Sequence, residues 1–224
     1  MELVILHHNR ISSKHRIYEG VKRWLDILIC LLVMPVALPA MALCAALTYL
    51  ETGRPVFFVQ ERIGRGGRIF RIYKFRSMRV GCENSTSRAF MKAYIRGASS
   101  EKQVDGKTYK PIQAHQIPRI GRFLRKTSLD ELPQLINVLK GEMSLVGPRP
   151  FVLWEVEEFQ PWHFERQEVL PGITGLAQVL GRSSIEFNSL VRYDIEYIEH
   201  RSLLLDLKIM YWTFAQVIGG KGAS

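Results

Sequence analysis

The feature that most constrains this chain is an apolar run at residues 27–50, which holds 24 residues and no charged side chain. At about 1.5 Å per residue, a straight helix of this length would reach about 36 Å, enough to cross a hydrocarbon core of about 30 Å. The run begins well inside the chain and lacks a convincing small-residue cleavage site, which argues against a cleaved signal peptide. A buried core helix is the alternative, but so long an uncharged run favours a helix embedded in a membrane.

Two prolines and two basic flanks argue against a simple span. Pro35 and Pro39 lie near the middle of the run, where each removes a backbone donor and disfavours a straight helix. Basic residues stand on both sides, which are Arg10, Lys14, Arg16, Lys22 and Arg23 before the run and Arg54, Arg62, Arg65, Arg68, Arg71, Lys74, Arg76 and Arg79 after it. Positively charged flanks tend to remain cytoplasmic, so one crossing would misplace one of them.

The sequence therefore favours a re-entrant helix that is broken at Pro39 and enters and leaves the membrane by the same face. In this interpretation Lys22, Arg23 and Asp26 lie at the lipid headgroups. A bitopic helix that crosses the membrane once is the alternative.

The net charge of +10 permits two kinds of anionic partner, a nucleic acid or a membrane surface. The excess is concentrated in the first 79 residues, which hold 13 basic and 5 acidic residues, a net of +8. These basic residues crowd the apolar run and do not form a stripe interleaved with aromatics or a known DNA-reading motif. We therefore predict a membrane surface and no nucleic acid. The 3 cysteines contain no C-x-x-C pair, which excludes a disulfide framework or a zinc site of that kind.

Alternation and periodicity predict the elements beyond the apolar run. Residues 55–60 and 67–75 are predicted as two strands around a Gly-rich turn, and residues 88–95 as a short helix in a polar segment. Three more helices are predicted at residues 151–167, 193–200 and 203–218. The last of these is too charged to span comfortably, so it is predicted to lie in the membrane interface or to pack on the first helix.

The most informative segment begins at Ser128. The spacing of Ser128 and Glu131 is that of a capping box, and an apolar stripe then continues to a natural helix stop at Gly141. This pattern places Asp130 and Glu131 in the first turn of an amphipathic helix. A purely structural interpretation is available, in which Glu131 caps the helix and Asp130 complements its dipole.

The surroundings of this acidic pair favour chemistry over capping. Arg122, Arg125 and Lys126 precede the pair, and the stiff turn Gly147-Pro148-Arg149-Pro150 follows it. Two carboxylates among arginines suit a site for a phosphate diester and a metal ion. An aspartate in a first helical turn stays ionised, as a carboxylate nucleophile or a Mg²⁺ ligand must.

Several ordered motifs together resemble those of the bacterial sugar transferases, the monotopic phosphoglycosyl transferases that load a sugar phosphate onto a polyprenyl phosphate. The resemblance covers residues 22–217. Its motifs are Lys22-Arg23-x-x-Asp26, Pro39, Gln60-Glu61-Arg62-x-Gly64, Ile72-Tyr73-Lys74-Phe75-Arg76-Ser77-Met78, Ser128-Leu129-Asp130-Glu131-Leu132, Asn137-Val138-Leu139-Lys140-Gly141, Gly147-Pro148-Arg149-Pro150 and Pro171-Gly172-Ile173-Thr174-Gly175.

The resemblance implies a two-step reaction. Asp130 would attack the sugar-bearing phosphorus of a nucleoside diphosphate sugar, expected to be a UDP-sugar, and release the nucleoside monophosphate, UMP. Polyprenyl (undecaprenyl) phosphate would then attack the aspartyl-phosphosugar and give polyprenyl-diphosphosugar. Mg²⁺ is implied as a cofactor at Asp130 and Glu131, with Glu131 either its ligand or a base. Lys74, Arg125 and Arg149 match positions near phosphate, and Arg76 is a further residue that could face it.

The resemblance also implies a fold, a place and partners. The fold is α+β and mostly helical, with a basic tail at 1–20, a re-entrant membrane helix at 21–50 and a small cytoplasmic catalytic domain at 51–224 that includes interfacial amphipathic helices. The implied location is the cytoplasmic face of the bacterial inner membrane. The partners are inner-membrane lipids, downstream glycosyltransferases and, in a homodimer, a second copy.

The pathway would be the first membrane step of exopolysaccharide, O-antigen or glycoconjugate assembly. The chain corresponds to the short form, in which no multi-span extension is expected before Lys22. The segment 80–118 departs from the short members, which leaves the sugar open. The alternative is a catalytically silent membrane-bound regulator or scaffold that binds polyprenyl phosphate. Such a protein could lose Asp130 or Arg149, and the presence of both favours the enzyme.

Overall fold

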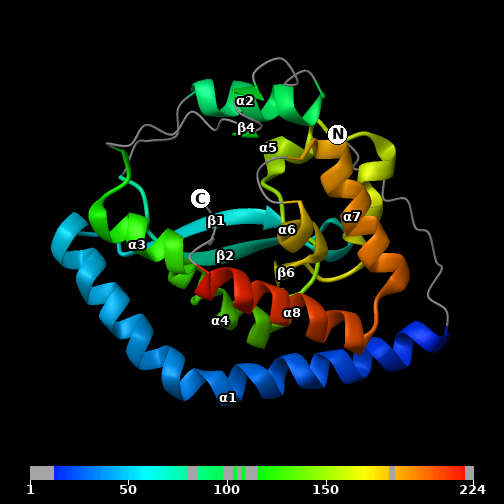
Figure 1. Ribbon diagram of the computed structural model, residues 1–224, viewed down its shortest axis with the longest axis horizontal. Coiled ribbons are helices and arrows are strands. Elements are labelled where there is room, and N and C mark those ends of the chain that lie inside the picture. The colour runs from blue at the N-terminus through cyan, green and yellow to red at the C-terminus, as the bar shows by residue number, and fades with distance from the viewer. Residues whose placement is uncertain are drawn as a thin grey trace.

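The computed structural model describes residues 13–79, 85–97, 103–104, 107–108, 116–181 and 185–219. A long bent helix, α1 (Ser13–Thr52), runs along one side of a domain built from shorter helices and small sheets (Figure 1). Within these ranges the sheets are all two-stranded and helices predominate. The prediction of a mostly helical α+β chain is confirmed.

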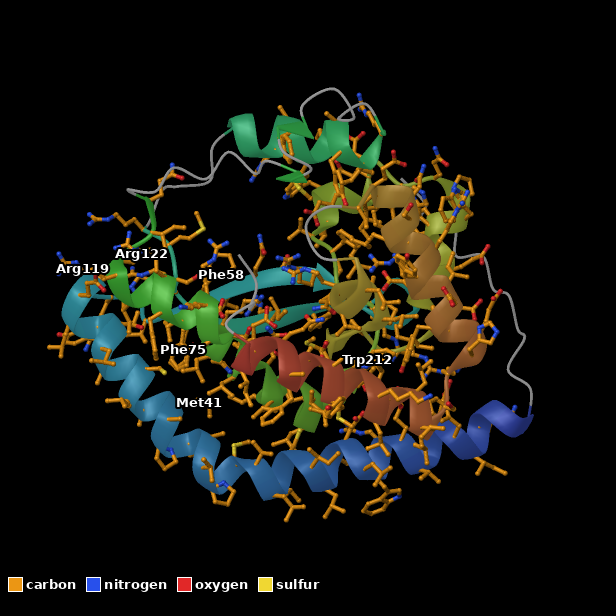
Figure 2. The ribbon with its side chains drawn as sticks, viewed as in Figure 1. Met41, Phe58, Phe75, Arg119, Arg122 and Trp212 are labelled. Carbon is orange, nitrogen blue, oxygen red and sulfur yellow. The ribbon has the colours of Figure 1, made fainter. Side chains whose placement is uncertain are left out.

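Helix α1 is longer than predicted and is not interrupted. It begins at Ser13, so residues 13–20 of the predicted tail are helical, and it continues through Pro35 and Pro39 to Thr52. The break predicted at Pro39 is therefore a bend: the ribbon changes direction close to Met41 without leaving the helix (Figures 1 and 2). A proline inside a helix removes one hydrogen bond and its ring displaces the carbonyl four residues earlier, which bends the helix without requiring it to end.

Most of the apolar surface of α1 faces away from the domain. Its most apolar window has a mean hydropathy of 2.6, and only 22% of that window is buried against protein. Large side chains are exposed along the whole helix, among them Trp24, Leu28, Leu32, Val36, Leu43, Leu47 and Leu50. A core helix would bury these groups. The described chain thus contains one helix that could span a membrane.

The polar residues of the first half of α1 contact protein. Asp26 is only 4% exposed, and it accepts a hydrogen bond from the hydroxyl of Ser144 at 2.7 Å. The ammonium group of Lys22 lies 2.9 Å from a carboxylate oxygen of Asp206, with 13% of its side chain exposed. Both side chains are thus directed to polar groups of the domain, and their place at headgroup depth stays a prediction.

Arg23 is likewise turned inward. Its guanidinium donates to the carbonyls of Val138 at 2.6 Å and Leu139 at 3.0 Å, in the last turn of α4 (Gln134–Lys140). Carbonyls at a helix end lack partners within the helix, so a cation there satisfies them and also complements the helix dipole. Arg23 therefore joins α1 to the helix that follows the acidic pair.

The end of α1 is held by two charged side chains. Arg76 is buried and donates to the carbonyls of Thr52 at 2.6 Å and Gly53 at 2.8 Å, so it caps α1 and does not face phosphate as expected. The carboxylate of Glu51 accepts from the backbone N–H groups of Arg119 and Ile120 at 2.8 and 2.6 Å. These are the first residues of α3 (Arg119–Thr127). The end of α1 is thus fixed to both neighbouring elements.

The predicted hairpin is confirmed. Strands β1 (Phe57–Ile63) and β2 (Ile69–Phe75) pair antiparallel, with Phe58 opposite Lys74, around the short 3-10 turn η1 (Arg65–Gly67). Helix α2 (Ser85–Ile95) covers the predicted short helix, and the two-residue strands β3 (Gln103–Val104) and β4 (Lys107–Thr108) pair beyond it.

The acidic pair does not begin a helix as the capping-box pattern predicts. Ser128 has a left-handed backbone (φ 56°) and no capping hydrogen bond from its side chain. Asp130 and Glu131 form the short 3-10 turn η4 (Leu129–Glu131), and α4 begins after Pro133. Leu132 and Pro133 both have right-handed helical backbone angles, but Pro133 has no N–H to continue the hydrogen-bond ladder from η4 into α4. The predicted stop at Gly141 is confirmed, with φ 80° and the last helical residue at Lys140.

The remaining elements surround a parallel strand pair, β5 (Ser144–Val146) and β6 (Gly172–Thr174). The single helix predicted over 151–167 is two short pieces, α5 (Leu153–Val156) and η5 (Pro161–Glu168), separated before Pro161. The chain then forms α6 (Leu176–Leu180), α7 (Phe187–His200) and α8 (Leu203–Ile218). The last two confirm the predicted helices.

Candidate active site

Three of the predicted site residues meet at one carboxylate. The Lys74 ammonium on β2 donates to Oε1 of Glu131 at 2.6 Å, and Nη1 of Arg149 lies 4.0 Å from the same oxygen. Lys74 and Glu131 are mostly buried, with 15% and 18% of their side chains exposed, whereas Arg149 is 43% exposed. Residues far apart in the sequence therefore converge on the turn η4.

Glu131 is held in its ionised form. Burial acts to raise the pKa of its carboxyl group, but the positive charges of Lys74, Arg149 and Arg62 outweigh burial and lower that pKa. The cations around Glu131 therefore stabilise its carboxylate as an anion. This arrangement favours a role for Glu131 as the charge partner of Lys74, Arg149 and Arg62, which together form a cationic wall.

Asp130 has a different environment from its neighbour. Among the described residues no cationic group lies within 4.0 Å of its carboxylate. Burial, followed by the negative charge of Glu131, raises the pKa of Asp130 to about 6, against the opposing effect of Lys74 and Arg125. Asp130 is therefore ionised at neutral pH but remains more basic, and a better nucleophile, than an ordinary aspartate.

Arg125 acts on Asp130 through its charge from the last turn of α3. It is half-buried, while Arg122 on the same helix is exposed (Figure 2). Helix α3 is tightly seated, because a Cβ added at Gly121 would lie 2.2 Å from the carbonyl oxygen of Ser77. The structure thus brings all five predicted site residues into one region, although only Lys74 and Arg149 contact Glu131 as ion-pair partners.

The turn that bears Arg149 is built on contacts between glycines. The N–H of Gly147 donates to the carbonyl of Thr174 at 2.8 Å, and the N–H of Gly172 donates to the carbonyl of Pro148 at 2.9 Å. A Cβ at Gly172 would lie 2.1 Å from the nitrogen of Gly147. Glycine is therefore required here by the close approach of the two backbones.

A buried ion pair, which the sequence analysis missed, supports the same turn. Arg166 is 4% exposed, pairs with the buried Asp194 of α7, and donates to the carbonyl of Arg149 at 2.8 Å. Its guanidinium also lies 4.1 Å from the centroid of the Phe151 ring. Nothing in the local pattern of residues 151–167 or 193–200 distinguishes Arg166 or Asp194 from solvent-facing charges, so no sequence signal pointed to them.

Asn137 is a second supporting residue that the sequence analysis named only within a motif. It is fully buried, its amide oxygen accepts from the N–H of Tyr73 at 3.2 Å, and its amide nitrogen donates to the carbonyl of Arg71 at 2.7 Å. These bonds join α4 to β2, the strand of Lys74. A polar residue within an otherwise apolar helix segment was the signal that could have identified it.

Arg62 lies on β1 and completes the cationic wall. It donates to the carbonyl of Pro150 at 3.1 Å and to the side chain of Gln60 at 2.6 Å. Its positive charge contributes to the lowered pKa of Glu131. The motif Gln60-Glu61-Arg62 therefore belongs to the site, on the same strand pair as Lys74.

The acidic pair could supply only part of the coordination sphere of a magnesium ion. No group of three His, Cys, Asp or Glu side chains that could hold a metal occurs in the described residues. Mg²⁺ commonly binds one or two carboxylates and completes its octahedron with substrate phosphates and water. Asp130, which lacks a close cation in the described chain, and Glu131 meet this requirement.

The site thus combines a mostly buried acidic pair and basic side chains in a chain whose described part has one helix that could span a membrane. The family model described as bacterial sugar transferase matches residues 17–220. The chain therefore belongs to the bacterial sugar transferase family.

Curated relatives support this assignment. The chain is 41% identical over 210 residues to the galactosyl transferase CpsE of Streptococcus agalactiae, covering 90% of this chain and 43% of that protein. It is 38% identical over 226 residues to the UDP-N-acetylgalactosamine-undecaprenyl-phosphate N-acetylgalactosaminephosphotransferase of Aeromonas hydrophila, covering 97% and 49%. The chain thus spans less than half the length of these two relatives. It covers 89% of a third, the uncharacterized sugar transferase EpsL of Bacillus subtilis, at 35% identity.

Proposed function

We propose that this protein transfers a sugar-1-phosphate from a nucleoside diphosphate sugar to polyprenyl phosphate. The observation that carries the proposal is the division of charge at η4, where Glu131 is paired with Lys74 and Asp130 has no close cationic partner among the described residues. The names of relatives, including the undecaprenyl-phosphate galactose phosphotransferase of Salmonella typhimurium, support this class of substrate. A UDP-sugar and undecaprenyl phosphate are the proposed donor and acceptor.

The proposed first step makes Asp130 the nucleophile. A carboxylate oxygen of Asp130 forms a bond to the sugar-bearing phosphorus, and the bond from that phosphorus to the bridging oxygen breaks. The nucleoside monophosphate leaves with this oxygen, and an aspartyl-phosphosugar remains. The cations Lys74, Arg149 and Arg62 face the developing negative charge, which is the main requirement of phosphoryl transfer.

The proposed second step returns Asp130 to its starting state. A phosphate oxygen of the polyprenyl phosphate attacks the same phosphorus, and the bond to Asp130 breaks, which gives polyprenyl-diphosphosugar. Arg125 lowers the cost of the regenerated carboxylate through its charge. Glu131 keeps Lys74 and Arg149 in place throughout, so we assign it a positioning role beside Asp130.

Magnesium is the proposed cofactor, held by Asp130 and Glu131 together with the donor diphosphate. When bound, it would neutralise diphosphate charge and make the nucleoside monophosphate a better leaving group. Chelation with EDTA is expected to stop turnover, and added Mg²⁺ to restore it. Turnover that is indifferent to chelation would remove the metal from the scheme.

For the membrane, we propose that α1 is re-entrant and that the site lies on the cytoplasmic face of the bacterial inner membrane. The bend near Met41, the exposed apolar side chains on α1 and the basic residues on both flanks support this topology. Impermeant thiol reagents should label cysteines introduced at Arg16 and Arg54 from the same side. Labelling from opposite sides would indicate a bitopic helix. We further propose that the protein acts in exopolysaccharide, O-antigen or glycoconjugate assembly, ahead of downstream glycosyltransferases. We also propose that it forms a homodimer.

The experiment that tests the catalytic proposal is release of nucleoside monophosphate from a set of UDP-sugars without any lipid acceptor. The wild-type protein should release up to one equivalent, and Asp130→Asn should release none, because the amide cannot form the phosphosugar ester. Glu165→Gln, at an exposed carboxylate of η5, is the matched control and should behave as wild type. Normal release by Asp130→Asn would overturn Asp130 as the nucleophile, and no release by the wild type with any donor would favour the silent regulator or scaffold.

A further inference from the structure

The start of β1 exposes three consecutive apolar side chains beside the charged site. Phe57, Phe58 and Val59 are 49%, 37% and 48% exposed. Successive strand residues point to opposite faces, so this run presents apolar surface on both faces of the hairpin. Phe58 is the one of the three on the face of Lys74, which makes it a candidate for contact with a ligand that has both an anionic and an apolar part.

Phe58 shares a sheet face with Lys74. The two residues are directly opposite in the antiparallel register, which brings their Cβ atoms to about 4.5–5.5 Å in such pairs. Lys74 in turn donates to Glu131. The ring of Phe58 is therefore a direct neighbour of the cationic wall, and Figure 2 shows it close to the start of β1.

An apolar cluster joins this end of the hairpin to α1. Val56, Met41 and Ala45 pack on the buried residues Cys44, Phe75 and Leu124, and Leu129 packs on the same cluster. Leu129 immediately precedes Asp130, so apolar contacts run from the second half of α1 to the acidic pair. On the outer side of that half of α1, Leu43, Leu47 and Leu50 are exposed.

We propose that Phe58 contacts the first isoprenoid units of the lipid acceptor. The inference rests on the proposed function and adds an acceptor-recognising residue to it. A polyprenyl phosphate is an anion joined to an apolar chain, and the pair of Lys74 with Phe58 complements both parts. The continuity of this surface with α1 favours the lipid over the other aromatic ligand, the nucleobase of the donor.

The test separates the two half-reactions. Phe58→Ala should raise the KM for undecaprenyl phosphate about tenfold, the effect expected from losing a partly buried ring. Nucleotide release without acceptor, and the KM for the donor, should stay within about twofold of wild type. Phe58→Leu, which keeps an apolar side chain, should recover most of the acceptor affinity.

Ile69→Ala is the matched control, because Ile69 is an equally apolar, exposed residue at the other end of the same hairpin. It should leave the KM for both substrates unchanged. An unchanged acceptor KM in Phe58→Ala would overturn the proposal, and a raised donor KM would assign the ring to the nucleobase. Failure of the proposed function itself would be distinct, since the wild-type protein would then release no nucleotide.

Discussion

Two buried groups of charges in this protein are arranged in opposite ways. Between α7 and η5, Arg166 and Asp194 are both almost fully buried and paired with each other. At η4, the corresponding match is incomplete, because Lys74 and Arg149 are directed to Glu131 while Asp130 has no such partner in the described chain. The first arrangement is a closed pair, and the second leaves one carboxylate for another ligand.

A second closed network shows the same contrast at α1. Asp206 accepts from Lys22 at 2.9 Å and from the hydroxyl groups of Tyr18 and Tyr197, both at 2.8 Å. Every oxygen of Asp206 is thereby satisfied across α1, α7 and α8. Fully satisfied polar groups fix the relative positions of elements, whereas an incompletely paired carboxylate with a raised pKa marks a candidate for chemistry.

The largest expected effect comes from opening the closed pair. Asp194→Asn would leave the guanidinium of Arg166 buried and uncompensated, which should lower the free energy of unfolding by about 3–5 kcal/mol. Thermal unfolding in detergent would measure this loss. Glu196→Gln, at an exposed position of the same helix, is the control and should leave stability unchanged. Wild-type stability in Asp194→Asn would mean that the pair does not hold the turn of Arg149.

The opposite sign is expected at Asp130. Its pKa of about 6 exceeds the unfolded value of about 3.9, so the folded state favours the protonated form and loses stability as pH rises between these values. Asp130→Asn cannot ionise and should be more stable than wild type by on the order of 2 kcal/mol at pH 8. The difference should vanish below pH 4. Unfolding measured at both pH values would check this, and a destabilised variant at pH 8 would contradict it.

The smallest effect sharpens the comparison within the site. Because Asp130 must be ionised to attack, nucleotide release should rise with pH through about 6 and then level off. Glu131→Gln removes a negative charge that raises the pKa of Asp130, so the midpoint should move to lower pH, whatever the loss in rate. The pH profile of release without acceptor measures the midpoint, with Glu165→Gln as control. A midpoint that stayed or rose would mean that Glu131 does not act on Asp130 electrostatically.

Local patterns predicted the elements whose signals are local. The alternation of residues 67–75 and the apolar helix at 203–218 depend on near neighbours, and both elements form where expected. The stop at Gly141 was predictable for the same reason, since a left-handed residue ends a helix whatever surrounds it. The capping box failed because Ser128 has a left-handed backbone and makes no capping hydrogen bond, and because Pro133 has no N–H to continue the ladder into α4.

The inward contacts of α1 could not have been predicted in this way. Basic residues at the end of an apolar run look the same in sequence whether they face headgroups or protein. The partners of Lys22, Arg23 and Asp26 lie 115 to 184 residues away in the chain. Only the fold brings them together.

The sequence by itself determined that this chain has a membrane-compatible helix, a β-hairpin and the motifs of a bacterial sugar transferase, because these depend on composition, periodicity and ordered short patterns. Tertiary structure alone decided that Glu131 is the paired carboxylate and Asp130 the one with a raised pKa. The physical reason is that pairing and burial are set by Lys74, Arg149 and Arg125, which reach the acidic pair from three separate segments. The same two adjacent residues therefore have different properties, which their order in the chain does not encode.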